Sequence, residues 1–149
     1  MKEKGDKSIV LSKGCVLLFA LLLAVLDLGC YWIAGWYIRL RYMPWQSAWA
    51  LMASVYVGSV FGWVCLYKLW RLLGNLGAGA VFTAENVGLL RAVSRCCVGA
   101  ALVCLVSSVY YLPFLLLALA AGFMALIVRI VKNVFQQAVA MKSELDLTI

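Results

Sequence analysis

The residue with the clearest chemistry in this sequence is Asp27, the one acidic side chain inside an apolar run. It lies in "GCVLLFALLLAVLDLGCYWIAGWYI", residues 14–38. A carboxylate in mid-membrane costs on the order of 3 kcal/mol to insert, so such groups usually face a protein interior or a wet cavity. Two interpretations stay open. Asp27 exchanges protons in a small transporter or channel component, or it is protonated or hydrogen-bonded to a neighbouring helix or arginine.

Enzyme chemistry finds no support among the other residues. The chain has no histidine, the commonest general base and metal ligand. None of its six cysteines forms a CxxC pair, and we interpret them as small apolar residues. The glycine-rich "GNLGAG", residues 74–79, lacks the Lys-Ser/Thr ending of a phosphate loop, so we expect a turn there. We therefore expect a non-enzymatic protein with no catalytic residue, cofactor or metal.

Composition predicts that these residues sit in membrane helices. Of 149 residues, 66% are hydrophobic and 13% are charged, against roughly half and a quarter in soluble domains. Four predicted helices cover about residues 14–38, 47–70, 84–111 and 114–144, and a span needs about 20 residues. The first run continues past Cys30, which favours an uncleaved helix over a signal peptide. We predict one all-α transmembrane domain over residues 1–149, a four-helix bundle.

Charged and aromatic residues predict the orientation of this bundle. Basic residues gather at the N-terminus, in the middle connection and after the fourth run, for example Lys13, Lys68, Arg91 and Arg129. Tyrosines and tryptophans gather at the other ends of the runs. Because positive residues favour the cytoplasm, we expect both termini inside, with a cytoplasmic extension of helix 4. The net charge of +7 is then topological, with no direct binding of nucleic acid.

The second run carries a row of small residues. Ala50, Ser54, Gly58 and Gly62 follow one another at intervals of four. That spacing places them on one helix face and lets a neighbouring helix approach closely. We expect this face to serve helix packing, within the chain or in a homo-oligomer.

A compact polar stretch, "AVFTAENVGLLR", residues 80–91, precedes the third run. Thr83 suits a helix N-cap, and Glu85 in the first turn complements the helix dipole. Asn86 takes the place of Glu or Gln in a capping box. The third helix is therefore predicted to begin near Ala84, before the chain enters the membrane beyond Arg91.

The end of the chain, "VFQQAVAMKSELDLTI", continues the helical pattern of the fourth run. Apolar residues from Val134 to Leu145 recur on one face, and Lys142 interrupts that face. Three alternatives stay open for this end. It docks on the chain's own polar stretch, where Glu85 or Asn86 binds it, for example through an Arg91 or Lys142 pairing, it adds a strand to a partner, or it frays. The candidate interaction residues are Phe82, Thr83, Glu85, Asn86, Arg91, Phe135, Asp146, Leu147, Thr148 and Ile149.

Together the polar stretch and the closing segment resemble the bacterial domain-of-unknown-function 2975 family. The resemblance rests on the Phe82–Asn86 stretch, on Leu90 and Arg91, on Phe135, and on the final Glu144–Ile149. It implies a small four-span protein of the bacterial cytoplasmic membrane, often encoded beside a helix-turn-helix regulator. No biochemical activity comes with it, and it gives Asp27 no role.

The sequence thus predicts a regulatory membrane protein that binds or sequesters a cytoplasmic DNA-binding regulator through the polar stretch and the closing helix. Two alternatives differ in kind. One is a small proton-coupled transporter or channel component that uses Asp27. The other is a structural membrane subunit that packs through Gly58 and Gly62.

Overall fold

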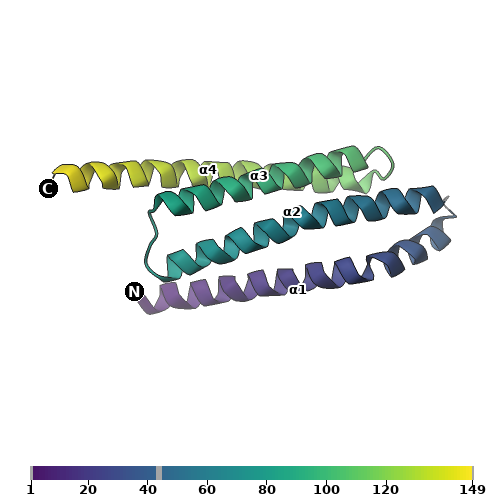
Figure 1. Cartoon of the computed structure of the whole chain (residues 1–149), viewed down its shortest axis with the longest axis horizontal. Coiled ribbons are helices and arrows are strands. Elements are labelled where there is room, and N and C mark those ends of the chain that lie inside the picture. The colour runs from purple at the N-terminus through teal and green to yellow at the C-terminus, as the bar shows by residue number, and fades with distance from the viewer. Residues whose placement is uncertain (1, 43–44, 149) are drawn as a thin grey trace.

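The described residues form four antiparallel helices (Figure 1). The computed structural model describes residues 2–42 and 45–148, with the side chains of residues 2–6, 41 and 45 left out. The helices are α1 (Lys2–Arg41), α2 (Trp45–Gly77), α3 (Ala84–Ser107) and α4 (Pro113–Thr148). Both termini and the connection between α2 and α3 lie at one end of the molecule, which we call the basic end (Figure 1). The described residues contain no strand.

Each helix packs on its neighbour in sequence. Close backbone approaches join α1 to α2, α2 to α3 and α3 to α4. Among the described residues α1 and α4 make no such approach to each other, so the helices form an open bundle with α1 and α4 at its edges. The short connections impose this order, since each leaves room only for an antiparallel neighbour.

All four helices are long and apolar enough to cross a membrane. Their apolar side chains are also largely on the outside, where Leu28 is 84% exposed and Leu116 71%. Apolar surface of this extent is unfavourable in water and favourable against lipid. The chain is therefore a multi-pass membrane protein, as its composition indicates.

The helices differ from the predicted ones mainly at their ends. α1 begins at Lys2 rather than at residue 14, α2 continues to Gly77, and α4 continues to Thr148. In α1 the added flank, residues 2–13, contains lysine, glutamate and other polar residues that a helix accepts, so the helix extends beyond the apolar run that defined the prediction. α3 begins at Ala84 as predicted but ends at Ser107, and α4 begins at Pro113, whose fixed φ suits the first position of a helix.

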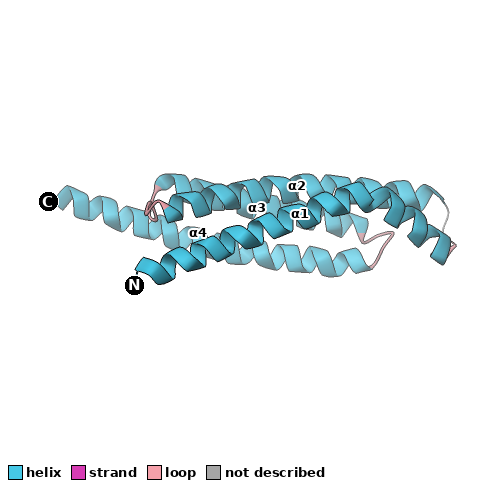
Figure 2. Cartoon of the chain, turned by 90° about the horizontal axis from the view of Figure 1, so that it is seen from below, coloured by secondary structure: helices cyan, strands magenta, loops and turns pink. Residues whose placement is uncertain are grey.

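The unequal lengths of α3 and α4 leave one helix end without a neighbour. α4 has 36 residues against 24 in α3, so roughly 18 Å of α4 has no α3 beside it. Both views show the C-terminal part of α4 extending past every other element (Figures 1 and 2). The residues from Ala140 to Thr148 are accordingly all exposed.

Two small buried clusters hold the helices together. Near the end opposite the basic end, Cys30, Ala34 and Ile38 of α1 pack against Ala48 and Met52 of α2. At the basic end, Leu72 of α2 packs with Leu89 and Leu90 of α3, and Val128 and Phe135 of α4 cover them. The second cluster therefore joins three helices.

Gly99 of α3 lies directly against the ring of Phe61 of α2. A Cβ atom built there would stand 2.5 Å from the Phe61 ring, whereas one built at Gly58 would meet nothing within 4 Å. The spacing of small residues in the sequence predicted close helix packing at Gly58 and gave no such prediction for Gly99.

Substituting Gly99→Ala should therefore destabilise the protein, because the Phe61 ring must shift to admit the methyl group. We expect a loss of about 1–3 kcal/mol, measured as a lower thermal unfolding midpoint in detergent micelles. Gly58→Ala is the matched control and should leave stability unchanged or raise it by up to about 1 kcal/mol. A midpoint that falls equally in both variants would contradict the close approach.

Candidate functional site

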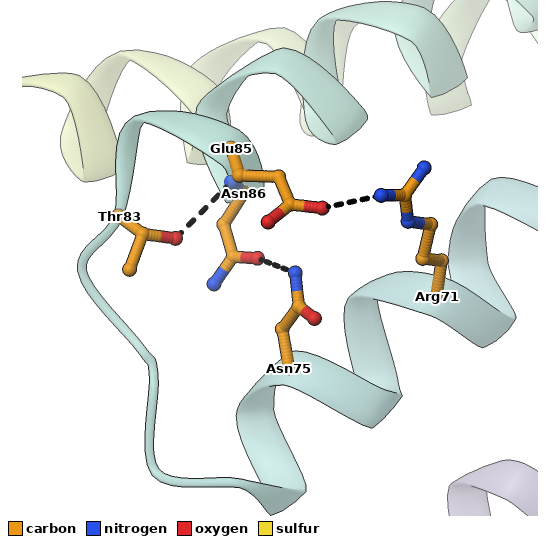
Figure 3. Close-up of polar contacts among 5 residues, drawn as sticks. All are labelled: Arg71, Asn75, Thr83, Glu85 and Asn86. Carbon is orange, nitrogen blue, oxygen red and sulfur yellow. Dashed lines mark hydrogen bonds and ion pairs between the residues drawn. The ribbon is translucent and has the colours of Figure 1, made fainter.

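Asn86, in the first turn of α3, is the most completely enclosed large side chain that the structure describes, with 0% exposure. Its Nδ2 donates to the carbonyl oxygens of Ala80, at 2.7 Å, and Val81, at 2.8 Å. Its Oδ1 accepts from Nδ2 of Asn75 in α2, at 2.9 Å (Figure 3). Both amide hydrogens and the carbonyl oxygen are thus used, as a buried amide requires. These residues form what we call the Asn86 cluster: Asn75, Ala80, Val81, Thr83 and Asn86.

The turn that brings this loop to Asn86 depends on Gly79. α2 ends in a Schellman arrangement, in which the Ala80 amide donates to the Asn75 carbonyl and the Gly79 amide donates to the Leu76 carbonyl. Gly79 has a φ of 78°, a left-handed conformation that glycine adopts without strain. The other two glycines of "GNLGAG", Gly74 and Gly77, remain helical. The predicted turn is therefore present, at one of the three glycines.

Thr83 and Glu85 act as the sequence predicted for a helix start. The Thr83 hydroxyl oxygen accepts from the Asn86 amide at 3.3 Å and caps α3. Glu85 pairs with Arg71 of α2, with Oε1 and Nη2 2.9 Å apart (Figure 3). Both side chains of this pair are about half exposed, so it stabilises the α2–α3 contact only modestly.

The capping-box role assigned to Asn86 differs from what the structure contains. Its side chain bonds to the loop carbonyls and to Asn75 rather than to the Thr83 amide. The reason is geometric. The loop before α3 folds back over the start of the helix and places the Ala80 and Val81 carbonyl oxygens within reach of the short Asn86 side chain. Asn86 is thus a loop-fixing residue as well as a helix-start residue.

Phe82 connects this loop to α4. Its ring lies 5.6 Å from that of Phe135, centroid to centroid. Phe135 in turn packs on the buried Leu72, Leu89 and Leu90 cluster. The polar stretch and the closing segment therefore contact each other through this aromatic pair, at the base of the projecting part of α4.

The last residues of the chain do not fold back onto this loop. Asp146 and Leu147 are exposed, and the Thr148 hydroxyl donates within its own helix to the Glu144 and Leu145 carbonyls. Ile149 lies outside the described residues. Pairing of Glu85 or Asn86 with Lys142 is therefore wrong, since Glu85 is paired with Arg71 and Asn86 is enclosed.

Arg91 stands apart from the Asn86 cluster and lines a basic cleft. This cleft, between α3 and α4, has a volume of about 350 Å³ and is formed by Arg91, Ser94, Arg95, Val98, Arg129 and Lys132. Sequence reasoning treated these basic residues as topology signals and did not place them together. The spacing of Arg91 and Arg95 was the available signal.

Asp27 is held by α2. Its Oδ2 accepts from the Trp63 indole nitrogen at 2.9 Å, and its backbone carbonyl accepts from the Tyr56 hydroxyl at 3.2 Å. The other carboxyl oxygen, Oδ1, is buried with no hydrogen-bond partner among the described residues. Asp27 thus has the neighbouring-helix partner that one sequence interpretation expected.

The row of small residues on α2 serves two neighbours rather than one. Ser54 takes part in a hydroxyl cluster with Ser107 and Tyr110, at the end of α3, and Tyr110 also donates to the Ala50 carbonyl. Gly62 faces α1, where a Cβ atom would stand 3.1 Å from Leu23. A step of four residues turns a helix by 40° beyond a full turn, so the row drifts from α3 toward α1.

Sequence analysis did not identify two partners of the polar stretch, residues 80–91. Asn75 and Arg71 face Asn86 and Glu85 across the loop (Figure 3). Asn75 was visible as the polar residue within the glycine-rich segment, but its pairing depends on how the loop closes.

Comparison with protein families gives one match. The model of a family described as protein of unknown function, DUF2975, matches residues 37–149. The matched part contains α2, α3, α4 and the whole Asn86 cluster, and Asp27 lies outside it. Comparisons with curated proteins and with solved structures give no match.

Asn86→Asp should loosen the loop that these contacts fix. The carboxylate has no hydrogen to donate, so the Ala80 and Val81 carbonyls lose their partners and face a like partial charge. We expect a loss of roughly 2–4 kcal/mol in stability, offset by less than about 1 kcal/mol from the helix dipole. Limited proteolysis of residues 78–83 in detergent should accelerate. The exposed Asn133→Asp is the control, and equal proteolysis of both variants would contradict the role of Asn86.

Proposed function

We propose that this chain, which belongs to the DUF2975 family, is a non-enzymatic membrane protein that presents the end of α4 to a cytoplasmic protein. The observation that carries the proposal is the projection of α4. Residues 140–148 are helical, and every one of them is exposed.

The projecting segment has a face suited to a partner. Val134, Ala138, Met141 and Leu145 recur at intervals of four and three residues, which aligns them on one side of the helix. Met141 and Leu145 are 59% and 66% exposed. An amphipathic helix with anchors at this spacing is a common ligand for an apolar groove on another protein.

The Asn86 cluster explains why the polar stretch belongs to the same function. It fixes the loop that carries Phe82, and Phe82 packs on Phe135 one turn beyond Val131. In this proposal Phe82, Thr83, Glu85 and Asn86 do not touch the partner. They hold the base of the helix that does, and the contact residues are Met141, Leu145 and the closing Asp146–Thr148.

We assign the basic end to the cytoplasm, because lysine and arginine favour that side of a membrane. The partner of choice is a DNA-binding regulator of the helix-turn-helix kind, which the family resemblance associates with such proteins. Capture of that regulator at the membrane would keep it from DNA.

Deletion of residues 143–149, and separately the pair Met141→Asp and Leu145→Asp, should abolish capture of the regulator. Each removes or charges the apolar face, and burial of an unpaired charge disfavours binding by at least about tenfold. The readout is crosslinking in intact cells, affinity purification of the full chain and mass spectrometry. Both variants should still insert in the membrane.

Ser143→Asp is the matched control, because residue 143 lies on the opposite face of the same helix turn. It should leave capture unchanged. Equal capture of a DNA-binding protein by the deletion variant and the wild type would refute the proposal, and so would recovery of copies of this chain alone.

The alternative of proton-coupled transport keeps one specific observation in its favour. Oδ1 of Asp27 is buried without a hydrogen-bond partner among the described residues, as a group that exchanges protons would be. The bond from Trp63 to Oδ2 and the position of Asp27 outside the matched family region favour a structural role.

Asp27→Asn separates these two functions. The amide keeps an acceptor for Trp63 and cannot ionise, so we expect normal insertion and unchanged capture of the regulator. Proton flux into vesicles, followed with a pH-sensitive dye, should match protein-free vesicles for both wild type and variant. A flux that the wild type supports and Asp27→Asn abolishes would favour the transporter instead.

A further inference from the structure

The basic cleft between α3 and α4 is a concentration of like charge without a partner. Arg91 and Arg95 come from α3, and Arg129 and Lys132 come from α4. No acidic residue lines the cleft, and in the described part of the chain none of the four cations forms an ion pair. Four cations that converge from two helices repel one another unless an anion lies between them.

The depth of these residues in the membrane strengthens the requirement for an anion. A hydrocarbon core about 30 Å thick corresponds to about 20 helical residues. Counted from Ser107 and from Pro113, at the other end, its edge falls near residue 88 in α3 and near residue 132 in α4. Arg95 and Arg129 then lie inside that edge, where an unpaired charge is costly.

The cleft opens directly into an apolar groove. Ser94, Val98 and Arg129 line both, and the groove continues between α3 and α4 with a volume of about 340 Å³. Leu102 and Leu126 line the groove, and the small side chains of Gly122 and Ala125 leave space between the two helices. The Ser94 hydroxyl donates to the Ala125 carbonyl at 3.2 Å, which holds the two helices together at the junction.

The groove is long enough to hold a lipid acyl chain. It extends along α4 from Arg129 to Leu115, about 21 Å at 1.5 Å per residue. One leaflet of hydrocarbon is about 15 Å deep. The charged cleft therefore lies at the edge of the hydrocarbon core, with Arg95 and Arg129 inside that edge, and the groove continues from there through the depth that an acyl chain occupies.

We propose that this composite site binds one anionic phospholipid, with its phosphate among Arg91, Arg95, Arg129 and Lys132 and an acyl chain in the groove. Arginine suits this role because its planar guanidinium donates two hydrogen bonds to a phosphate. Basic pockets between membrane helices are a known form of anionic-lipid site. The α4 helix that carries Arg129 and Lys132 also carries the projecting end, but the lipid site stands independently of the proposed function.

The test is native mass spectrometry of the full chain in nonionic detergent, titrated with phosphatidylglycerol or with phosphatidylcholine of identical acyl chains. We expect phosphatidylglycerol to be retained at least about tenfold better, and Arg95→Gln with Arg129→Gln to remove that preference. Lys13→Gln with Lys68→Gln removes two charges outside the cleft and should leave the preference intact. Equal retention of the two lipids by the wild type, or equal loss in both pairs, would overturn the proposal.

A second variant tests the groove without altering charge. A Cβ atom at Gly122 meets nothing within 4 Å, so Gly122→Leu should fold normally and fill the groove. It should weaken phosphatidylglycerol retention at least about tenfold, while Gly58→Leu, at another open glycine, should not. Glycerol phosphate supplies the head group alone. Binding of glycerol phosphate as strong as that of the lipid, unaffected by Gly122→Leu, would mark a free-anion site and overturn the lipid assignment.

Discussion

The hydrogen bonds of Asn86 are the constraint on which the rest of the basic end depends. A buried amide is tolerated only when its donors and acceptor are all used, and here they join the loop carbonyls of Ala80 and Val81 to Asn75 of α2. Each bond contributes only about 1 kcal/mol net, but the loss of a partner leaves a buried polar group unpaired. The loop between α2 and α3 therefore has one favoured conformation, and Phe82 has one position.

That position determines how α4 leaves the bundle. Phe82 and the Leu72, Leu89 and Leu90 cluster both contact Phe135, which is the last point where α4 touches the other helices through described aromatic contacts. From Ala140 onward the helix is exposed, and its direction follows from this base. The basic cleft lies on the same pair of helices, α3 and α4, nearer the membrane. The proposed partner-binding face and the proposed lipid site therefore both depend on how α4 packs against α3.

The sequence predicted the helices well because the signals are strong and local. Long apolar runs identify membrane helices, and Thr83 with Glu85 places the start of α3 at Ala84. It also predicted the family, which residues 37–149 match. Helix ends were less accurate, because the polar flanks of α1 and α4 continue the helix without continuing the apolar pattern. The pairing of Gly99 with Phe61 depends on the rotation of two helices, which spacing within either helix does not give.

Sequence analysis selected candidate interaction residues but did not give the contacts that these residues make. Phe82, Asn86 and Phe135 were selected as an interaction surface. In the structure Phe82 and Phe135 contact each other, and Asn86 bonds to the loop and to Asn75 of α2. A short motif can identify residues that matter, but their contacts depend on the conformation of the loop and on the packing of helices that are distant in sequence. The same holds for Arg91, Arg95, Arg129 and Lys132, whose convergence requires the antiparallel packing of α3 and α4.

Hydrogen–deuterium exchange of the full chain in detergent tests most directly whether the Asn86 cluster holds the base of α4. The account predicts slow exchange over residues 83–90 and 131–136 in the wild type, with fast exchange over 140–148. In Asn86→Asp exchange should rise in both slow segments, because loss of the loop conformation releases Phe82 from Phe135. A rise confined to residues 78–90, with 131–136 unchanged, would contradict the claim that this buried asparagine positions the projecting helix.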